Sequence, residues 1–161
     1  MIVVCNTSPI TNLTAVGQLN LLQQLYSSII IPKAVYDEIA GLDCTGPGAV
    51  EVQTQSWIQT LHVTDTNRVI ELQAVLDRGE AEAIVLALEL GADLLLLDER
   101  RGRKVASQLG LKRTGLLGVL LEAKQNGLIP AIKPMMDELI SQVGFRISNK
   151  LYADVLQSAG E

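Results

Sequence analysis

Short apolar runs alternate with longer amphipathic segments along this chain. Residues 1–5 and 94–97 are continuous apolar runs, which is typical of strands buried on both faces of a parallel sheet. Residues 29–31, 57–63 and 112–114 are further candidate strands, the last of them at an edge. Because strands alternate with helical segments, the pattern predicts an α/β fold with a mainly parallel sheet.

The segments between the apolar runs carry helix start and stop signals. Ser8 and Pro9 are typical of an N-cap followed by the first helical residue, and they predict a helix that ends near Gly17. The acidic turn at residues 77–80 predicts a helix that continues to Leu90 and stops at Gly91. Further helices are expected at residues 19–26, 33–40, shortly after 48, 65–76, 99–109, 115–126, 132–143 and 149–159.

The length and composition favour one globular domain. The chain has 161 residues, of which 48% are apolar, enough for a continuous core. Three Gly and one Pro within residues 41–48 predict a loop. We expect residues 1–161 to form a single domain, with residues 128–161 as a helical C-terminal extension.

The cysteine content and the N-terminus point to a reducing compartment. Cys5 and Cys44 do not form a recognisable disulfide framework, and a small buried thiol is the expected role of Cys5. The chain lacks a signal peptide pattern, and no apolar run approaches the roughly 20 residues needed to span a bilayer. These features predict a cytoplasmic protein with no membrane partner.

Oxygen-bearing side chains occur at the ends of several predicted elements. Asn6 follows the first strand, and Asp98 follows the leucine strand. Glu38 lies on the helix after the second strand, and Glu80 opens the helix before the leucine strand. Because ligands bind beyond the carboxyl ends of strands in open α/β sheets, we expect these four side chains to converge on one crevice.

Such a cluster favours a divalent cation. Three carboxylates and a carboxamide with no neutralising Lys or Arg would repel one another, and Mg²⁺ prefers oxygen ligands and substrate phosphate. Two such ions about 4 Å apart can activate water for phosphodiester cleavage. Glu38, Glu80 and Asp98 would then anchor metal and Asn6 would offer its carbonyl oxygen. Thr7 and Ser8 would supply orienting hydroxyls.

Each acid also has a structural interpretation. Glu80 and its neighbour Glu82 sit where acids stabilise a helix start. Asp98 is placed to cap the helix that follows it, and Glu38 is placed to be a solvated surface residue. Taken singly, each acid fits the structural role better, and the set as a whole favours the metal site.

Charge constrains the partners. The net charge is -5, whereas a protein that coats duplex nucleic acid along a broad face usually has a positive net charge. A local basic run follows Asp98, however, and positive charge in the first turn of a helix opposes the macrodipole. Binding of substrate phosphates would explain this basic run, and the alternative is that the run is a solvated helix face. The residues of this run are Arg100, Arg101, Arg103 and Lys104.

The order of these motifs resembles the PIN-domain family over nearly the whole chain. "IVVCNTSPI" is similar to the family's first strand, "IPKAVYDEI" to its second block, and "GEAEAIVLALELGADLLLLDE" to its third and fourth. That register puts the family's acidic positions at Glu38, Glu80 and Asp98, with Glu82 as the neighbour left open. "GLLGVLLEAKQNGLIP" and the helical tail resemble a little-characterised prokaryotic branch near the VapC-type toxins.

The resemblance implies both a fold and an activity. It implies a three-layer α/β/α sandwich with a parallel sheet of about five strands, and Mg²⁺- or Mn²⁺-dependent cleavage of RNA. For toxin branches it also implies a small antitoxin partner and a homodimer.

Two residues depart from the family pattern, and the smaller departure is Glu80 in place of the commoner Asp. The family usually has Asp where this chain has Asn6, so one unit of negative charge is missing. The prediction is therefore a metal-dependent endoribonuclease, with a catalytically weak or inactive nucleic-acid- or protein-binding module as the alternative.

Overall fold

The computed structural model describes residues 1–42 and 45–161, and its centre is a five-stranded sheet in the order β3-β2-β1-β4-β5. Every neighbouring pair is parallel. The strands are β1 (Val3–Cys5), β2 (Ile29–Pro32), β3 (Ile58–Leu61), β4 (Leu94–Leu96) and β5 (Arg113–Thr114). The predicted mainly parallel sheet of about five strands is confirmed.

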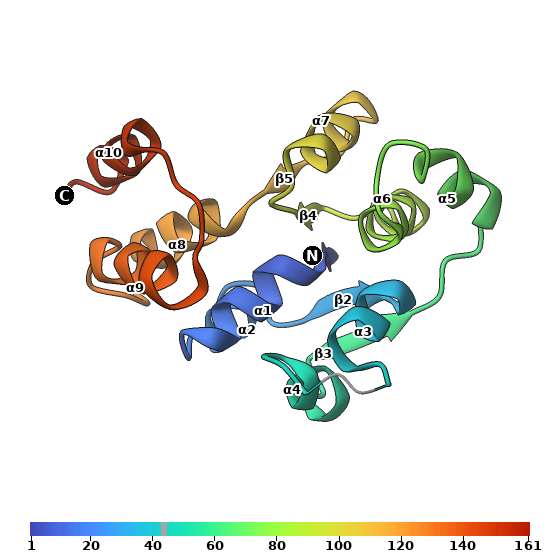
Figure 1. Cartoon of the computed structure of the whole chain (residues 1–161), viewed down its shortest axis with the longest axis horizontal. Coiled ribbons are helices and arrows are strands. Elements are labelled where there is room, and N and C mark those ends of the chain that lie inside the picture. The colour runs from blue at the N-terminus through green and yellow to red at the C-terminus, as the bar shows by residue number, and fades with distance from the viewer. Residues whose placement is uncertain (43–44) are drawn as a thin grey trace.

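Helices cover both faces of this sheet (Figure 1). Those between β1 and β4 are α1 (Thr7–Ala15), α2 (Asn20–Tyr26), α3 (Lys33–Ala40), α4 (Ala49–Thr54), α5 (Thr66–Leu72) and α6 (Arg78–Leu90). The later helices are α7 (Arg100–Gln108), α8 (Leu116–Gln125), α9 (Lys133–Val143) and α10 (Asn149–Ser158).

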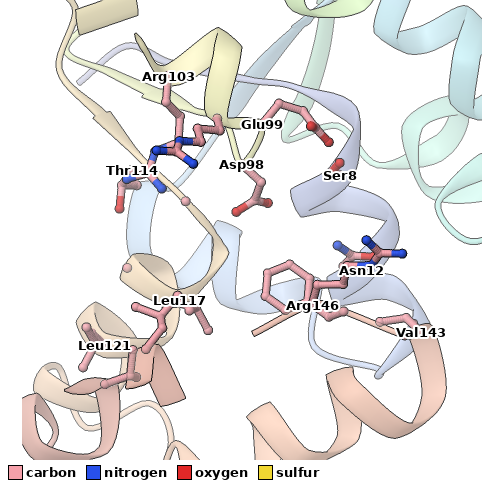
Figure 2. Close-up of a pocket in the computed structure, with 17 residues that line it drawn as sticks. Ser8, Asn12, Asp98, Glu99, Arg103, Thr114, Leu117, Leu121, Val143 and Arg146 are labelled. Carbon is pink, nitrogen blue, oxygen red and sulfur yellow. The ribbon is translucent and has the colours of Figure 1, made fainter. Parts of the chain in front are cut away.

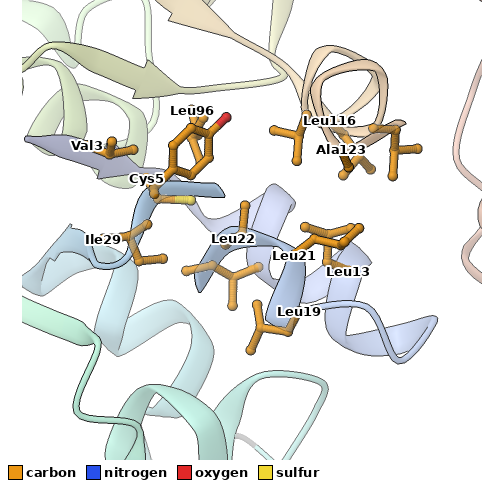
Figure 3. Close-up of a cluster of buried hydrophobic side chains, with 14 of the residues drawn as sticks. Val3, Cys5, Leu13, Leu19, Leu21, Leu22, Ile29, Leu96, Leu116 and Ala123 are labelled. Atoms are coloured by element: carbon orange, nitrogen blue, oxygen red, sulfur yellow. The ribbon is translucent and has the colours of Figure 1, made fainter. Parts of the chain in front are cut away.

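The two helical layers form separate apolar clusters because side chains alternate across a strand. Cys5 and Leu96 face the layer that contains α1, α2, α8 and α9, part of which Figure 3 shows. Val4 and Leu95 face the layer of α5, α6 and α7. All three residues of β1 and of β4 are buried, as their continuous apolar sequence predicts. The result is the expected three-layer α/β/α arrangement.

The last two helices contribute to the first of these clusters. Met136 and Leu139 of α9 are fully buried in it, and Val155 of α10 is buried at its margin. The Glu161 carboxylate accepts a hydrogen bond from the backbone N–H of Ile132 at 2.7 Å. The tail thus packs against the same core as the sheet.

The beginning of α1 differs from the prediction. Asn6, in extended backbone conformation, occupies the N-cap position, and Ser8 lies inside the helix. Asn6 still belongs to the sheet, since its N–H donates to the Leu96 carbonyl at 3.0 Å, so the chain turns into the helix at once. Pro9 is tolerated in the first turn because N–H groups there have no partner within the helix.

Other boundaries shift by a few residues. Helix α5 ends at Leu72, before the expected residue 76, and β3 is shorter than the range 57–63. Two residues of the expected loop at 41–48 lie outside the described part of the chain. Within the described residues, no helix is long and apolar enough to cross a bilayer.

Candidate functional site

The candidate residues come from the carboxyl edge of the sheet. Asn6 directly follows β1, and Asp98 lies just beyond β4, which is hydrogen-bonded to β1. Glu38 is on α3, the helix after β2, and Glu80 is in the first turn of α6. Adjacent parallel strands thus deliver Asn6 and Asp98 to the same edge, and two helices bring the glutamates towards it.

Asp98 is held from one side and unpartnered on the other. Its Oδ1 accepts a hydrogen bond from the backbone N–H of Leu116 at 2.7 Å, at the start of α8. Its Oδ2 is buried and has no hydrogen-bond partner among the described residues. Burial raises the pKa of Asp98, and the Leu116 N–H and the nearby Arg103 partly oppose this rise.

Asn6 presents a second buried oxygen. The residue is 4% exposed, and its Oδ1 accepts no hydrogen bond from the described part of the chain. A neutral amide costs less to bury than an unpaired carboxylate. Asn6 is therefore easier to keep at this position than Asp would be without a cation.

Glu80 is the most perturbed acid of the site. It is 7% exposed, and burial raises its pKa to about 8, with the acids Asp77, Glu99 and Glu38 adding to the rise. The backbone N–H of Glu80 donates to Asp77 Oδ1 at 2.8 Å, since Asp77 caps α6.

Glu38 is more exposed to solvent than Glu80 and Asp98. Burial of part of its carboxyl raises its pKa, and hydrogen bonds from the Thr7 hydroxyl and the Gly79 backbone oppose the rise. The Thr7 Oγ1 donates to Glu38 Oε2 at 2.5 Å. Glu38 is close enough to Glu80 to contribute to the rise in the pKa of Glu80.

Glu82, the alternative to Glu80, is occupied elsewhere. Its Oε1 accepts from the backbone N–H of Ala34 at 3.0 Å, in the first turn of α3. Its Oε2 accepts from Arg78 Nε at 3.1 Å. One oxygen of Glu82 therefore joins α6 to the first turn of α3, and the other binds a side chain in the first turn of α6 itself.

Three glycines make room for the three carboxylates. A Cβ at Gly79 would lie 2.3 Å from Glu38 Oε1, and a Cβ at Gly102 would lie 2.9 Å from Glu80 Oε2. A Cβ at Gly115 would lie 2.7 Å from Asp98 Oδ1. Any side chain at these positions would push a carboxylate out of its place.

The donor set suits a cation with oxygen ligands. Asn6 Oδ1 and Asp98 Oδ2 are buried oxygens that receive no hydrogen bond within residues 1–42 and 45–161, and oxygen is what Mg²⁺ and Mn²⁺ take. Among those same residues, no three His, Cys, Asp or Glu side chains are grouped closely enough to enclose an ion. The arrangement therefore fits a site that combines one or two carboxylates with the Asn6 amide and a substrate phosphate.

A cavity of about 1170 Å³ opens at Asp98 (Figure 2). Its polar wall includes Ser8, Arg100 and Arg103. In Figure 2 the carboxylate of Asp98 points into this space beside Arg103. A second cavity, of about 940 Å³, shares Asp98 and these two arginines and adds Lys104.

The basic run divides between these cavities. Arg100, Arg103 and Lys104 lie along one side of α7, as spacings of three and four predict. Arg101 lines a separate cavity of about 460 Å³ with Glu80, and Arg100 lines that cavity as well. Arg103 and Lys104 are thus on the Asp98 side, Arg101 is on the Glu80 side, and Arg100 lies between the two.

Sequence reasoning missed several residues of this region. Asp77 and Glu99 crowd Glu80, and Arg146 lines both cavities beside Asp98. Asp77 carried a signal, because an N-cap acid followed three residues later by Glu is a capping-box pattern. Arg146 carried none, since it comes from the distant connection between α9 and α10.

These features define a class: three-layer α/β/α domains with acids and an amide at the carboxyl edge of a parallel sheet, beside an arginine-lined cavity. A family model described as PIN domain matches residues 2–161. The chain belongs to the PIN-domain family, which has a nuclease-type fold. Comparison with curated proteins found no match.

Proposed function

We propose that this protein is a metal-dependent endoribonuclease that cleaves RNA phosphodiesters with activated water. The observation that carries this proposal is the position of Asp98, which lines a cavity together with Arg100 and Arg103 and whose buried Oδ2 has no hydrogen-bond partner among the described residues. A carboxylate beside arginines suits a cation and a phosphate at adjoining positions.

In this proposal the acids and Asn6 hold Mg²⁺ or Mn²⁺. Asp98 and the Asn6 amide would bind it directly together with a substrate phosphate, and Glu80 and Glu38 would add negative charge nearby. The bound cation would supply a nucleophile at neutral pH and stabilise the charge on the leaving oxygen.

Other residues orient these groups and the substrate. The hydrogen bond from Thr7 holds Glu38, and the Leu116 N–H fixes one oxygen of Asp98 while the other stays unpartnered among the described residues. Arg100 and Arg103 would bind the scissile phosphate and orient it towards Asp98.

The test is cleavage of an unstructured RNA with Mn²⁺ or Mg²⁺. Asp98→Asn keeps the shape of the side chain but removes its charge, and we expect it to lower cleavage by at least about 100-fold. Asp154→Asn makes the same change at an exposed position of α10 and should cleave as the parent does. Equal cleavage by all three proteins would refute the proposed active site.

A non-catalytic binding module is the second candidate, and Asn6 favours it because the site lacks one negative charge. Asn6→Asp should tighten Mn²⁺ binding by about tenfold if the parent already binds metal. Asn67→Asp adds the same charge on α5 and should leave the affinity for Mn²⁺ unchanged. Metal binding by Asn6→Asp alone, in calorimetry, would favour the non-catalytic module.

We further propose that the nuclease acts as the toxin of a toxin-antitoxin pair, in the cytoplasm and as a homodimer. The resemblance of residues 115–130 and the helical tail to a branch near the VapC-type toxins supports this proposal. Co-expression with the product of a neighbouring small gene is the direct test. Relief of growth inhibition and co-purification are the expected results, and neither would occur with an ordinary nuclease.

A further inference from the structure

The connection between α9 and α10 forms one wall of the Asp98 cavity. Gly144, Phe145 and Arg146 all line it, together with Val143 at the end of α9 (Figure 2). The connection lies far from Asp98 in sequence, so the tail brings new side chains to the candidate site.

This cavity has a charged side and an apolar side. Asp98, Arg100 and Arg103 provide the charged side. The apolar side chains that line it are Leu117, Leu121, Val143, Phe145, Leu151 and Val155. Phe145 is the single phenylalanine of the chain and is half-buried. A flat aromatic ring among aliphatic side chains, next to arginines, suits a nucleobase attached to its phosphate.

The neighbouring cavity is basic instead of apolar. It shares Asp98, Arg103 and Arg146 with the first cavity and adds Lys104 and Arg113. Arg113 Nε is buried and donates no hydrogen bond within the described residues. A buried guanidinium donor without an acceptor favours an anion there, and the repeated phosphates of a nucleic-acid strand supply anions.

We propose that Phe145 and Arg146 form a subsite for one unpaired nucleotide beside the scissile phosphate. The base stacks on Phe145 in the first cavity, Arg146 binds the adjoining phosphate, and the strand continues along the basic cavity past Lys104 and Arg113. This proposal rests on the proposed function and assigns it single-stranded RNA, since a base must leave its stack to enter the subsite.

The alternative role for Phe145 is packing alone. Its ring lies against the main apolar cluster, and its backbone N–H donates to the Leu139 carbonyl at 3.1 Å. Phe145→Leu keeps an apolar side chain and this backbone bond but removes the aromatic ring. Phe145→Tyr keeps the ring.

The experiment measures binding of two short unpaired RNAs that are identical except for one abasic nucleotide. The protein is full-length Asp98→Asn, which separates binding from cleavage. We expect the abasic RNA to bind between about 5-fold and 100-fold more weakly. Phe145→Leu should bind both RNAs equally, and Phe145→Tyr should restore the difference. Circular dichroism checks that each variant is folded.

Arg146 is tested by salt dependence. Arg146→Gln should lower the slope of log affinity against log salt by about one, as expected for the loss of one phosphate contact. Lys150→Gln removes a positive charge from α10 that lines neither cavity and should leave the slope unchanged.

The outcomes separate this subsite from the proposed function. If Phe145→Leu still discriminates against the abasic RNA as its parent does, the subsite is wrong even where RNA cleavage is observed. If discrimination depends on Phe145 but the unmodified protein cleaves no RNA with Mn²⁺, the subsite stands and the nuclease proposal fails. If neither RNA binds, both are overturned.

Discussion

At the scale of single residues, the site carries less negative charge at neutral pH than its acids suggest. Asn6 is neutral, and burial raises the pKa of Glu80 to about 8, so most Glu80 side chains are protonated at pH 7. Retaining a proton lets Glu80 remain beside Asp77, Glu99 and Glu38 without a counter-ion. A cation bound there would displace that proton.

Stability should therefore depend on pH through Glu80. Its pKa is raised from 4.5 in the folded chain, so its stabilising contribution is fully present below about pH 4.5 and is lost as the pH rises through 8. Glu80→Gln stays neutral throughout. We expect the variant to gain stability relative to the parent between pH 5 and pH 9 in urea denaturation without added metal.

The matched control is Glu138→Gln, at an exposed position of α9. Its free energy of unfolding should change with pH as that of the parent does across this range. If the free energy of unfolding of Glu80→Gln also changed with pH as that of the parent does, the raised pKa of Glu80 would be contradicted.

The sequence placed Asn6 and Asp98 at the ends of neighbouring strands, as observed, but did not predict their environments. Asn6 and Asp98 could be assigned to strand ends because β1 and β4 are short, fully apolar runs. The partners of Glu82, and the contact of Asp98 with the start of α8 instead of α7, come from packing between distant segments. Local patterns carry no information about such contacts.

At the scale of elements, the starts of helices position the carboxylates. Helix α8 begins after Gly115, and its first N–H, from Leu116, binds Asp98. Helix α6 begins beside Glu38, where the absence of a side chain at Gly79 leaves space for the carboxyl. The elements themselves were predictable from periodicity. The start of α1 was not predicted correctly. Asn6 is still hydrogen-bonded to the sheet and is the N-cap, so Ser8 and Pro9 lie inside the helix.

Gly115→Ala should separate the geometry of the site from stability. The new Cβ would lie 2.7 Å from Asp98 Oδ1, so Asp98 must rotate away from Leu116. We expect RNA cleavage to fall by roughly 10-fold to 100-fold, with a small change in melting temperature because the displaced group is a side-chain terminus.

Gly46→Ala is the control, since a Cβ there meets no atom within 4 Å among the described residues. It should retain full activity. A Gly115→Ala protein as active as Gly46→Ala would show that this carboxylate position is unimportant.

At the scale of the whole molecule, the C-terminal helices share the core with the sheet. Leu139 is fully buried in the same cluster as Cys5 and Leu96. We propose that residues 1–161 fold as one domain in which residues 128–161 are a required layer. The sequence predicted the tail helices, but their contribution to the core depends on tertiary packing.

Leu139→Ala tests this proposal. We expect the free energy of unfolding to fall by about 2–5 kcal/mol, measured through the fluorescence of Trp57, the single tryptophan, which precedes β3. Because Trp57 lies far from α9 in sequence, its transition should shift only if tail and sheet unfold together. Ile140→Ala, at an exposed position of the same helix, should shift it little. An unchanged Trp57 transition in Leu139→Ala would indicate an independent tail.

The strand order has a consequence for synthesis. β1 lies between β2 and β4, and Val4 pairs with Leu95, so one side of the first strand stays unpaired until the ribosome has made most of the chain. At roughly 5–20 residues per second this delay is on the order of ten seconds. During it Asp98 is absent, so the nascent chain would lack the proposed nuclease activity towards the RNAs around it.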